Sequence, residues 1–416
     1  MSLQPSAHPG FITCTAHARL TRFAQFALFI VTGVVAGNGC RPTGDQLHPD
    51  GIVRQTTIHE APGEYCAWPD IARTANGDII VLFCKSEEHL APDGSILLSR
   101  STDNGSTWEV PVTVFQTPID ERESGMTVLA DGRIIGHFWS TFHTPSGYAA
   151  LPPQSYEKSV IDRWTRVVES PEYTGAAGNR GGWTRISSDA GKTWSAPAHG
   201  PDAVHGGIQL KDGSLLVASY RSEQDDVGVY RAQSPEAPWR WVSGVRSPRP
   251  DSLRFGEPHV LQLPSGRIIM MIRATTIPYD DMNPLCVLWE SYSDDNGITW
   301  AEPFATPLWG FPPHLLLLSD GRVVCSYGYR RPPFGQRACV SEDGVTWKRD
   351  DEVILRDDAP NGDLGYPASI ELEPGLVLTV YYQPDVPAGT IQQMKPPDPH
   401  RKKPGILGTV WKVSQR

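Results

Sequence analysis

The sequence predicts an all-β fold, and more narrowly a six-bladed β-propeller. Two repeated patterns and the composition support this prediction. The first pattern is the octapeptide Ser-x-Asp-x-Gly-x-Thr-Trp, which recurs at long intervals, as expected of a repeat architecture. Its copies are Ser101–Trp108, Ser187–Trp194, Ser293–Trp300 and, one residue shorter, Ser341–Trp347. Asp and Asn bond their own backbone and Gly takes a positive φ, so we expect each copy, here called an Asp box, to build a hairpin turn and to carry no chemistry.

The second pattern is a strand, a glycine turn and another strand, repeated six times. The turn glycines are Gly77, Gly132, Gly213, Gly266, Gly321 and Gly375. They are separated by 55, 81, 53, 55 and 54 residues. Six such units, each with two apolar strands and often an Asp box, predict six blades. The chain also has 39 Gly, 38 Pro and 13 Trp, which is typical of a β protein rich in turns.

The order of the strands predicts how the ring closes. The last unit lacks a fourth strand, because the chain stops soon after residues 405–413. Segment 52–59, which precedes the first repeat, is expected to supply that strand and so to remove exposed sheet edges. The long interval of 81 residues contains an insertion near residues 140–182. Its Tyr, Trp and Arg content suits a binding loop, with a purely structural loop as the alternative.

Residues 1–50 are expected to be a targeting signal and linker, and residues 51–416 to form the propeller. Arg19 and Arg22 precede an apolar stretch that is too short to span a bilayer. Small residues then lead to Cys40, which we expect to be the lipidated first residue of a bacterial lipoprotein. Simple secretion, with cleavage near the same point, is the alternative. Either reading predicts an exported protein, periplasmic or at the cell surface, with a possible lipid anchor.

Charge and cysteine usage exclude some partners and cofactors. The net charge of −10 argues against nucleic acid. The seven cysteines show neither metal-ligand spacing nor a dense disulfide pattern, so we expect buried thiols. Pairing of Cys325 with Cys339 across neighbouring strands is the alternative. No metal or cofactor is expected, and we expect a monomer.

The repeat brings chemically useful side chains to one mouth of the central channel. The turn of each hairpin faces one side of the disc, so the residue nine before each turn glycine lies near the channel on the other side. Those residues are Trp68, Glu123, Val204, Glu257, Pro312 and Tyr366. The second strands end at the same face with Lys85, Arg221, Arg273, Arg330 and Gln383. Such convergence of carboxylate, tyrosine and arginine side chains marks a candidate functional site.

Over residues 51–416 the chain resembles the sialidase superfamily, the six-bladed Asp-box propellers of exo-acting glycosidases. The segment EPHVLQLPSGRIIMMIR resembles the family segment with a catalytic Glu and a carboxylate-binding Arg, which implies these roles for Glu257 and Arg273. The stretch SYGYRR resembles the site of the third arginine of that family, and implies Arg330 in preference to Arg331.

Two further segments carry the resemblance. GYPASIELEPG resembles the segment with the nucleophilic tyrosine, which implies Tyr366. KSEEHLAPDGSILLSRS resembles the first-blade loop with the acid/base carboxylate, for which we expect Glu87. Its competitors are Glu88, His89 and Asp93. Arginine forks bind a sugar carboxylate bidentately, and a Tyr–Glu pair lets a neutral phenol attack beside that carboxylate. Further candidates for contact with substrate are Trp68, His89, His205 and His314.

The chain departs from the family at the first arginine. Ala67 stands where sialidases carry that arginine, and Gln383 replaces the glutamate that steadies it. The two losses agree, because without the arginine its buried carboxylate partner would be left unpaired. The three-arginine clamp is thus reduced to two, unless one of three other cations substitutes. Those cations are Lys85, Arg122 and Arg337.

Together these observations predict an exo-acting, sialidase-like glycoside hydrolase whose partner is a glycan with a terminal acidic sugar. The first alternative is a propeller glycosidase or uronate lyase on another polysaccharide, which the loss of the first arginine favours. The second alternative is a propeller that binds glycans without turnover.

Overall fold

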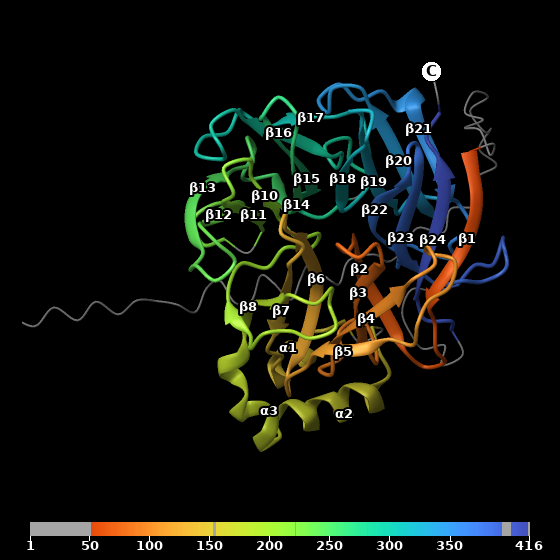
Figure 1. Cartoon of the computed structure of the whole chain (residues 1–416). Helices are drawn as coiled ribbons and strands as arrows, with labels where there is room; N and C mark the ends of the chain where they lie inside the picture. The colour runs from red at the N-terminus through yellow and green to blue at the C-terminus, as the bar shows by residue number, and fades with distance from the viewer. Residues whose placement is uncertain (1–50, 153–154, 221, 281, 393–400, 415–416) are drawn as a thin grey trace, which may run out of the picture.

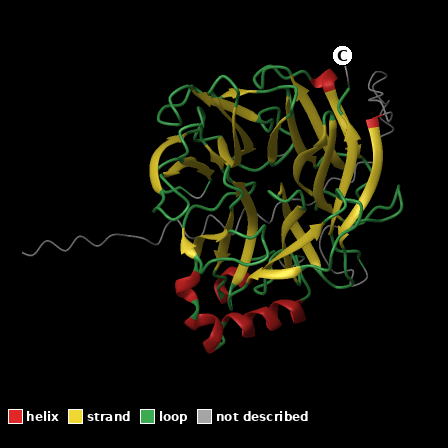
Figure 2. Ribbon diagram, viewed as in Figure 1, coloured by secondary structure: helices red, strands yellow, loops and turns green. Residues whose placement is uncertain are grey.

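The computed structural model describes residues 51–152, 155–220, 222–280, 282–392 and 401–414. These residues form six four-stranded antiparallel sheets arranged around a central axis, as predicted (Figure 1). The α-helices are few and gather at one edge of the ring (Figure 2). The proposed signal, with Cys40, lies outside the described residues. Among the described residues, no helix has the length and apolar character needed to cross a membrane.

Each blade is one sheet whose first strand lies nearest the axis. The first blade consists of β2 (Tyr65–Arg73), β3 (Ile79–Ser86), β4 (Ser95–Ser101) and β5 (Val112–Phe115). The second consists of β6 (Asp120–Val128), β7 (Ile134–Thr141), β8 (Gly181–Ser187) and β9 (Ala198–His199). The third consists of β10 (Ile208–Gln209), β11 (Leu215–Ser219), β12 (Val227–Ala232) and β13 (Arg240–Val245).

The remaining blades follow the same plan. The fourth consists of β14 (Leu253–Gln262), β15 (Ile268–Thr276), β16 (Trp289–Ser293) and β17 (Phe304–Ala305). The fifth consists of β18 (Pro313–Leu317), β19 (Val323–Tyr329), β20 (Gly335–Ser341) and β21 (Glu352–Arg356). The sixth consists of β22 (Gly365–Glu373), β23 (Leu376–Gln383), β24 (Gly405–Lys412) and β1 (Ile52–His59).

Strand β1 closes the ring, as predicted. It pairs antiparallel with β24, from Ile52 opposite Trp411 to His59 opposite Ile406, and Figure 1 shows the two strands side by side. Because the first strand of the chain completes the last blade, the outer edge of the β24 ladder is covered and the ring is tied shut.

The Asp boxes build turns, as predicted. Each connects the third and fourth strands of a blade. The Asp103 carboxylate accepts hydrogen bonds from the backbone N–H of Thr107 at 2.8 Å and from its hydroxyl at 2.6 Å. The same pair of bonds is made by Asp189, Asp295 and, in the shorter copy, Asp343. The carboxylate is therefore committed to its own turn.

Four of the six inner strands carry a bulge at the end nearest the mouth. At each bulge one residue that is not glycine has a positive φ: Trp68 (55°), Glu123 (47°), Glu257 (43°) and Tyr366 (51°). The strand register shifts at these positions. A left-handed backbone at such residues costs on the order of 1–3 kcal/mol, and a bulge re-aims a side chain. The backbone conformation at these four positions therefore lowers the stability of the fold, and the bulges reorient the four side chains.

The predicted insertion folds into helices between β7 and β8. It contains α1 (Pro145–Ala149), α2 (Lys158–Val168), α3 (Pro171–Gly175) and the 3-10 turn η4 (Ala177–Asn179). A small core of its own buries Tyr148, Trp164 and Tyr173 against Ala91, which belongs to the loop after β3. The insertion thus supports the first-blade loop expected to hold an acid/base residue.

The cysteines of the described region are buried free thiols. They are Cys66, Cys84, Cys286, Cys325 and Cys339. Cys325 and Cys339 are indeed cross-strand neighbours on β19 and β20, yet they do not form a disulfide.

Candidate functional site

Tyr366, Glu257 and Arg273 form one hydrogen-bonded group near the axis. The Tyr366 hydroxyl donates to Glu257 Oε1 at 2.7 Å, and Arg273 Nη1 donates to Glu257 Oε2 at 2.5 Å. Tyr366 lies on β22, whereas Glu257 and Arg273 lie on the paired strands β14 and β15. All three residues are buried. Side chains more than one hundred positions apart in sequence are thus brought into direct contact.

The electrostatics of this group suit proton transfer from the phenol. Burial and the negative charge of Glu257 raise the pKa of the Tyr366 hydroxyl well above its ordinary value, so the phenol is neutral near pH 7. The same carboxylate accepts the hydrogen bond of the phenol and is neutralised by Arg273. The arrangement can serve a neutral phenol nucleophile with Glu257 as its base.

Arg330 joins Arg273 on the same side of the site. Its Nε donates to the Leu364 carbonyl at 2.9 Å, and its guanidinium carbon lies 5.9 Å from the centre of the Tyr366 ring. Phe311 packs under both arginines. Its ring centre lies 5.5 Å from the guanidinium carbon of Arg330 and 4.5 Å from that of Arg273. Two guanidinium groups are therefore held beside the phenol by an aromatic ring, which suits recognition of a carboxylate.

Arg331 faces another part of the surface. Its guanidinium carbon lies 3.9 Å above the Trp309 ring, and it lines a surface cavity of about 240 Å³ with Trp309 and Tyr329. Of the two neighbouring arginines, Arg330 is therefore the one that the fold places beside Tyr366.

A tryptophan and another arginine lie near Ala67, the position at which the resemblance to sialidases implies a lost arginine. Ala67 is fully buried, and the adjacent Trp68 turns its ring to within 6.3 Å of the Tyr366 ring centre. The Arg122 guanidinium carbon lies 4.3 Å over the Trp68 ring, and Arg122 Nη1 donates to the His89 carbonyl at 2.6 Å. The second blade thus places a third arginine near the site, but its Nη1 also pairs with the buried Asp120 at 3.3 Å.

The other candidate substitutes for the first arginine are engaged elsewhere. Lys85 Nζ lies 3.9 Å from Glu64, and Arg337 Nη1 donates to the Arg356 carbonyl at 2.5 Å. Gln383 is fully buried and donates to Asp358 at 3.2 Å. At this position a neutral amide therefore donates to the Asp358 carboxylate.

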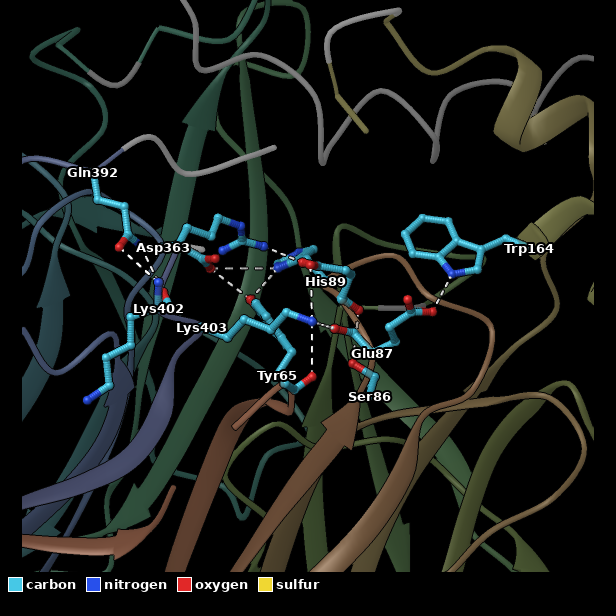
Figure 3. Close-up of polar contacts among 12 residues, drawn as sticks. Tyr65, Ser86, Glu87, His89, Trp164, Asp363, Gln392, Lys402 and Lys403 are labelled. Carbon is cyan, nitrogen blue, oxygen red and sulfur yellow. Dashed lines mark hydrogen bonds and ion pairs between the residues drawn. The ribbon is translucent and has the colours of Figure 1, made fainter. Parts of the chain in front are cut away.

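The three carboxylates of the loop after β3 all have structural partners. The Glu87 carboxylate pairs with Arg163 and accepts from Trp164 Nε1 at 2.9 Å, both on helix α2. Glu88 pairs with Arg401 and, at 3.2 Å, with Lys403. Asp93 accepts from the backbone N–H of Glu87 at 3.0 Å. The residue expected from sequence to be the acid, Glu87, is therefore turned toward the insertion, as Figure 3 shows.

His89, the remaining candidate in this loop, lies against the site. Its Nδ1 is 2.6 Å from the Tyr65 hydroxyl, which donates to Asp363 Oδ1 at 2.7 Å (Figure 3). The same imidazole nitrogen is 3.8 Å from Asp363 Oδ1. The ring packs edge-on against Trp68 with centres 5.3 Å apart. Loops from the first and sixth blades thus meet at one imidazole.

Three further histidines stack in the channel beside Tyr366. The His259 and His314 rings are parallel with centres 4.5 Å apart, and His205 lies 5.2 Å from His314 and 6.4 Å from Tyr366. Burial lowers the pKa of His259 to about 3 and holds the pKa values of His205 and His314 well below the ordinary value. Neutral imidazoles at this place fill the channel, and His314 Nδ1 accepts from the Ser369 N–H at 3.3 Å.

Possible metal ligands gather at one place in the part of the chain that the structure describes. Ligand atoms of His59, Glu64 and Cys66 lie within 4.8 Å of one another. His59 Nε2 already bonds Glu64 at 2.9 Å, and the Lys85 ammonium lies 3.9 Å from the other carboxylate oxygen. Because a histidine and a lysine already face this carboxylate, we assign no metal there.

Sequence reasoning missed the partners that orient these groups. Asp363 and Tyr65 hold His89, and Tyr220 donates to the Glu123 carboxylate at 2.9 Å. Asp363 and Tyr65 lie just before the inner-strand bulges at Tyr366 and Trp68. This proximity to two predicted mouth residues was the available signal, but nothing in the local sequence shows that the two loops meet.

Comparison with known proteins places the chain in a family. Residues 164–378, just over half of the chain, match the model of the BNR repeat-like domain. No curated protein sequence matches the chain.

Solved structures share the propeller fold with this chain. A Dyadobacter fermentans protein of unknown function is 22% identical, with 87% of this chain and 99% of that chain covered and a TM-score of 0.67. The Hadza microbial sialidase Hz136 is 16% identical, with 84% and 66% covered and a TM-score of 0.55. The Penicillium chrysogenum α-L-arabinanase is 14% identical, with 87% and 98% covered and a TM-score of 0.53. The chain belongs to the BNR repeat-like domain family and has the sialidase-like six-bladed propeller fold.

Proposed function

We propose that this protein is an exo-acting glycoside hydrolase that removes a terminal acidic sugar from a glycan. The hydrogen-bonded group of Tyr366, Glu257 and Arg273 carries the proposal. A carboxylate nucleophile would be repelled by an anionic sugar, whereas a neutral phenol would not, and sialidases have a tyrosine nucleophile. Arg273 and Arg330, both beside the phenol, would bind the sugar carboxylate.

In this reaction Tyr366 attacks the anomeric carbon while its proton passes to Glu257. The hydrogen bond of 2.7 Å between them is within the range needed for this transfer. The buried surroundings favour the protonated phenol. The nucleophile is therefore activated only as its proton passes to Glu257 during the attack.

The first prediction tests this role. Tyr366→Phe should lower kcat on 3′-sialyllactose by more than about 1,000-fold, because covalent catalysis loses its nucleophile. Release of free sugar from a panel of sialosides and uronosides measures the activity. Tyr381→Phe is the matched control, because the Tyr381 hydroxyl is equally buried but bonds Gln55 on the closing strand. Full activity of Tyr366→Phe would contradict the proposed mechanism.

A uronate lyase is the second candidate, which the fully buried Ala67 favours. With the first arginine absent, fewer guanidinium groups would hold the sugar carboxylate. A lyase needs the carboxylate of a uronate to be neutralised beside a tyrosine base, and the remaining arginines suit that role. An unsaturated product that absorbs ultraviolet light, released from a uronide, would select the lyase over the hydrolase.

A further inference from the structure

We propose that His89 is the proton donor to the leaving oxygen, and that Asp363 and Tyr65 position it. This inference rests on the proposed function and adds to it the acid/base residue, which the resemblance to sialidases had implied to be a carboxylate. Three observations support it. The carboxylates of the first-blade loop bond other partners, the imidazole of His89 is oriented by its neighbours, and His89 lies beside the nucleophile.

The carboxylates of the first-blade loop are committed to stabilising that loop. Glu87 is fixed by Arg163 and Trp164, which belong to the helical insertion. Glu88 holds the segment that contains Arg401 and Lys403. Leaving the buried Arg401 without its carboxylate partner would be costly. These contacts stabilise the first-blade loop, and we therefore assign the acid role to another group.

The imidazole of His89 is oriented by a buried carboxylate that acts through the Tyr65 hydroxyl. Its Nδ1 edge faces the Tyr65 hydroxyl and the Asp363 carboxylate, so Nε2 lies on the opposite edge of the ring. About a third of the side chain, 32%, is exposed, whereas the side chain of Asp363 is only 5% exposed. A buried carboxylate that orients a partly exposed histidine is the arrangement of general acid/base groups in unrelated hydrolases.

Asp363 is held in its ionised form. Burial alone would raise the pKa of the Asp363 carboxyl, but the nearby His89, the charge of Arg401 and the hydrogen bond from Tyr65 more than offset burial and lower it. An ionised carboxylate beside an imidazole favours the imidazolium, which is the form that donates a proton.

His89 also lies on the same aromatic wall as the nucleophile. Its ring contacts Trp68, whose ring contacts Tyr366, and Arg122 fixes the His89 carbonyl from the second blade. The left-handed backbone of Trp68 and Tyr366 turns both of these rings toward the axis. The acid and the nucleophile therefore reach the mouth from the first and sixth blades.

The proposed steps balance in atoms and charge. The bond between the anomeric carbon and the leaving oxygen breaks, and that oxygen takes the Nε2 proton of the His89 imidazolium. Tyr366 Oη forms a bond to the anomeric carbon and its proton passes to Glu257. Water then attacks the same carbon and gives a proton to His89 Nε2, while the bond to Tyr366 breaks and Glu257 returns the phenolic proton.

The test compares two glycosides of one sugar that differ in their need for an acid. The leaving alcohol of 3′-sialyllactose must be protonated, whereas 4-nitrophenol departs from its α-sialoside as a stable anion. His89→Gln should lower kcat/KM on 3′-sialyllactose by about 100-fold or more, and on the nitrophenyl substrate by less than about tenfold. Asp363→Asn should show the same selectivity with a smaller loss, because it acts through His89.

Two more variants and a folding measurement complete the experiment. His59→Gln is the matched control, since His59 also pairs with a carboxylate, Glu64 at 2.9 Å, and should leave both substrates unaffected. Glu87→Gln is the rival, and a selective loss on 3′-sialyllactose there would return the acid role to Glu87. Melting temperatures show whether each variant is folded.

The outcomes separate the inference from the proposed function. Equal losses on both substrates in His89→Gln, or no loss, would overturn the acid role while wild-type turnover still supports the hydrolase. Absence of sugar release by the wild-type protein from either substrate would overturn both.

Discussion

At the scale of single residues, the site depends on side chains that the backbone holds in an unfavourable conformation. Trp68, Glu123, Glu257 and Tyr366 all have positive φ and occupy equivalent places in four blades. Such strain persists only where the surrounding structure enforces it, and it is concentrated at functional sites. The strained positions and the hydrogen-bonded group around Glu257 coincide, which supports a functional reading of both.

The second prediction concerns the charge pair of this group. Glu257→Gln leaves the buried Arg273 without its ionic partner, so it should lower the free energy of unfolding by on the order of 3 kcal/mol. Glu236→Gln is the matched control, because Glu236 pairs with Arg133 on the surface with 59% of its side chain exposed. The control should change stability by about 1 kcal/mol or less. Chemical denaturation measures both, and equal losses would contradict the argument.

The sequence predicted the members of this group but not its orienting partners. The repeat pattern placed Glu257, Arg273 and Tyr366 at one mouth of the channel, and the resemblance to sialidases singled them out from the other residues there. The position of Glu87 depends on Arg163 and Trp164, which lie in an insertion outside the repeat. Its side chain direction follows from tertiary contacts with that insertion, which a repeat pattern cannot show.

At the scale of elements, the inner strands must approach one another closely around the axis. Gly206 has a φ of +76°, and a Cβ there would lie 1.8 Å from the Met126 carbonyl oxygen on β6. Gly213, in the following hairpin turn, has a similar φ of +84° but open space around it. The two glycines thus separate the cost of the backbone conformation from the cost of close packing.

The third prediction uses this pair. Gly213→Ala should lower the free energy of unfolding by about 1–2 kcal/mol, from the backbone conformation alone. Gly206→Ala should cost about 1–3 kcal/mol more, because the methyl group collides with the backbone of the neighbouring blade. Thermal and chemical denaturation of both variants measure the difference. Equal destabilisation would show that the blades move apart without cost at this position.

Repeated hairpins and the closing strand β1 were predictable because each follows from a local pattern. The helices of the insertion were not. Their cores depend on residues far apart, such as Tyr148 and Trp164 packed with Ala91 of the first blade. The insertion was expected to be a loop, and it is instead a small helical support for the wall of the site.

At the scale of the whole molecule, buried carboxyl groups link neighbouring blades. Asp70 on β2 accepts from the Met126 N–H on β6 at 2.6 Å, and Glu290 on β16 accepts from Trp347 Nε1 at 2.7 Å. Burial raises the pKa of Asp70 to about 7 and of Glu290 to about 8. Both groups keep their protons in the folded state at pH values where the unfolded chain has lost them.

The fourth prediction follows from this linkage. A carboxyl with a raised pKa in the folded state makes stability fall as pH rises from the unfolded pKa, near 4–5, to the folded one. These two carboxyls therefore contribute a decrease in the free energy of unfolding between pH 5 and pH 8, whereas the channel histidines, whose pKa values are lowered, contribute an opposite rise up to about pH 6.5. Glu290→Gln should flatten this decrease, by on the order of 2 kcal/mol across the interval. Parallel pH profiles for the variant and the wild-type protein would contradict the shift.

The ring follows from local patterns in the sequence: six glycine turns and four Asp boxes that recur with the blades, and one closing strand that precedes them. The sequence also determined which residues stand nearest the axis, because the register of a strand relative to its turn is local. Only the tertiary structure decided which side chains meet. Glu87 turns to α2 and His89 to Asp363 because segments from the second and sixth blades, distant in sequence, provide their partners.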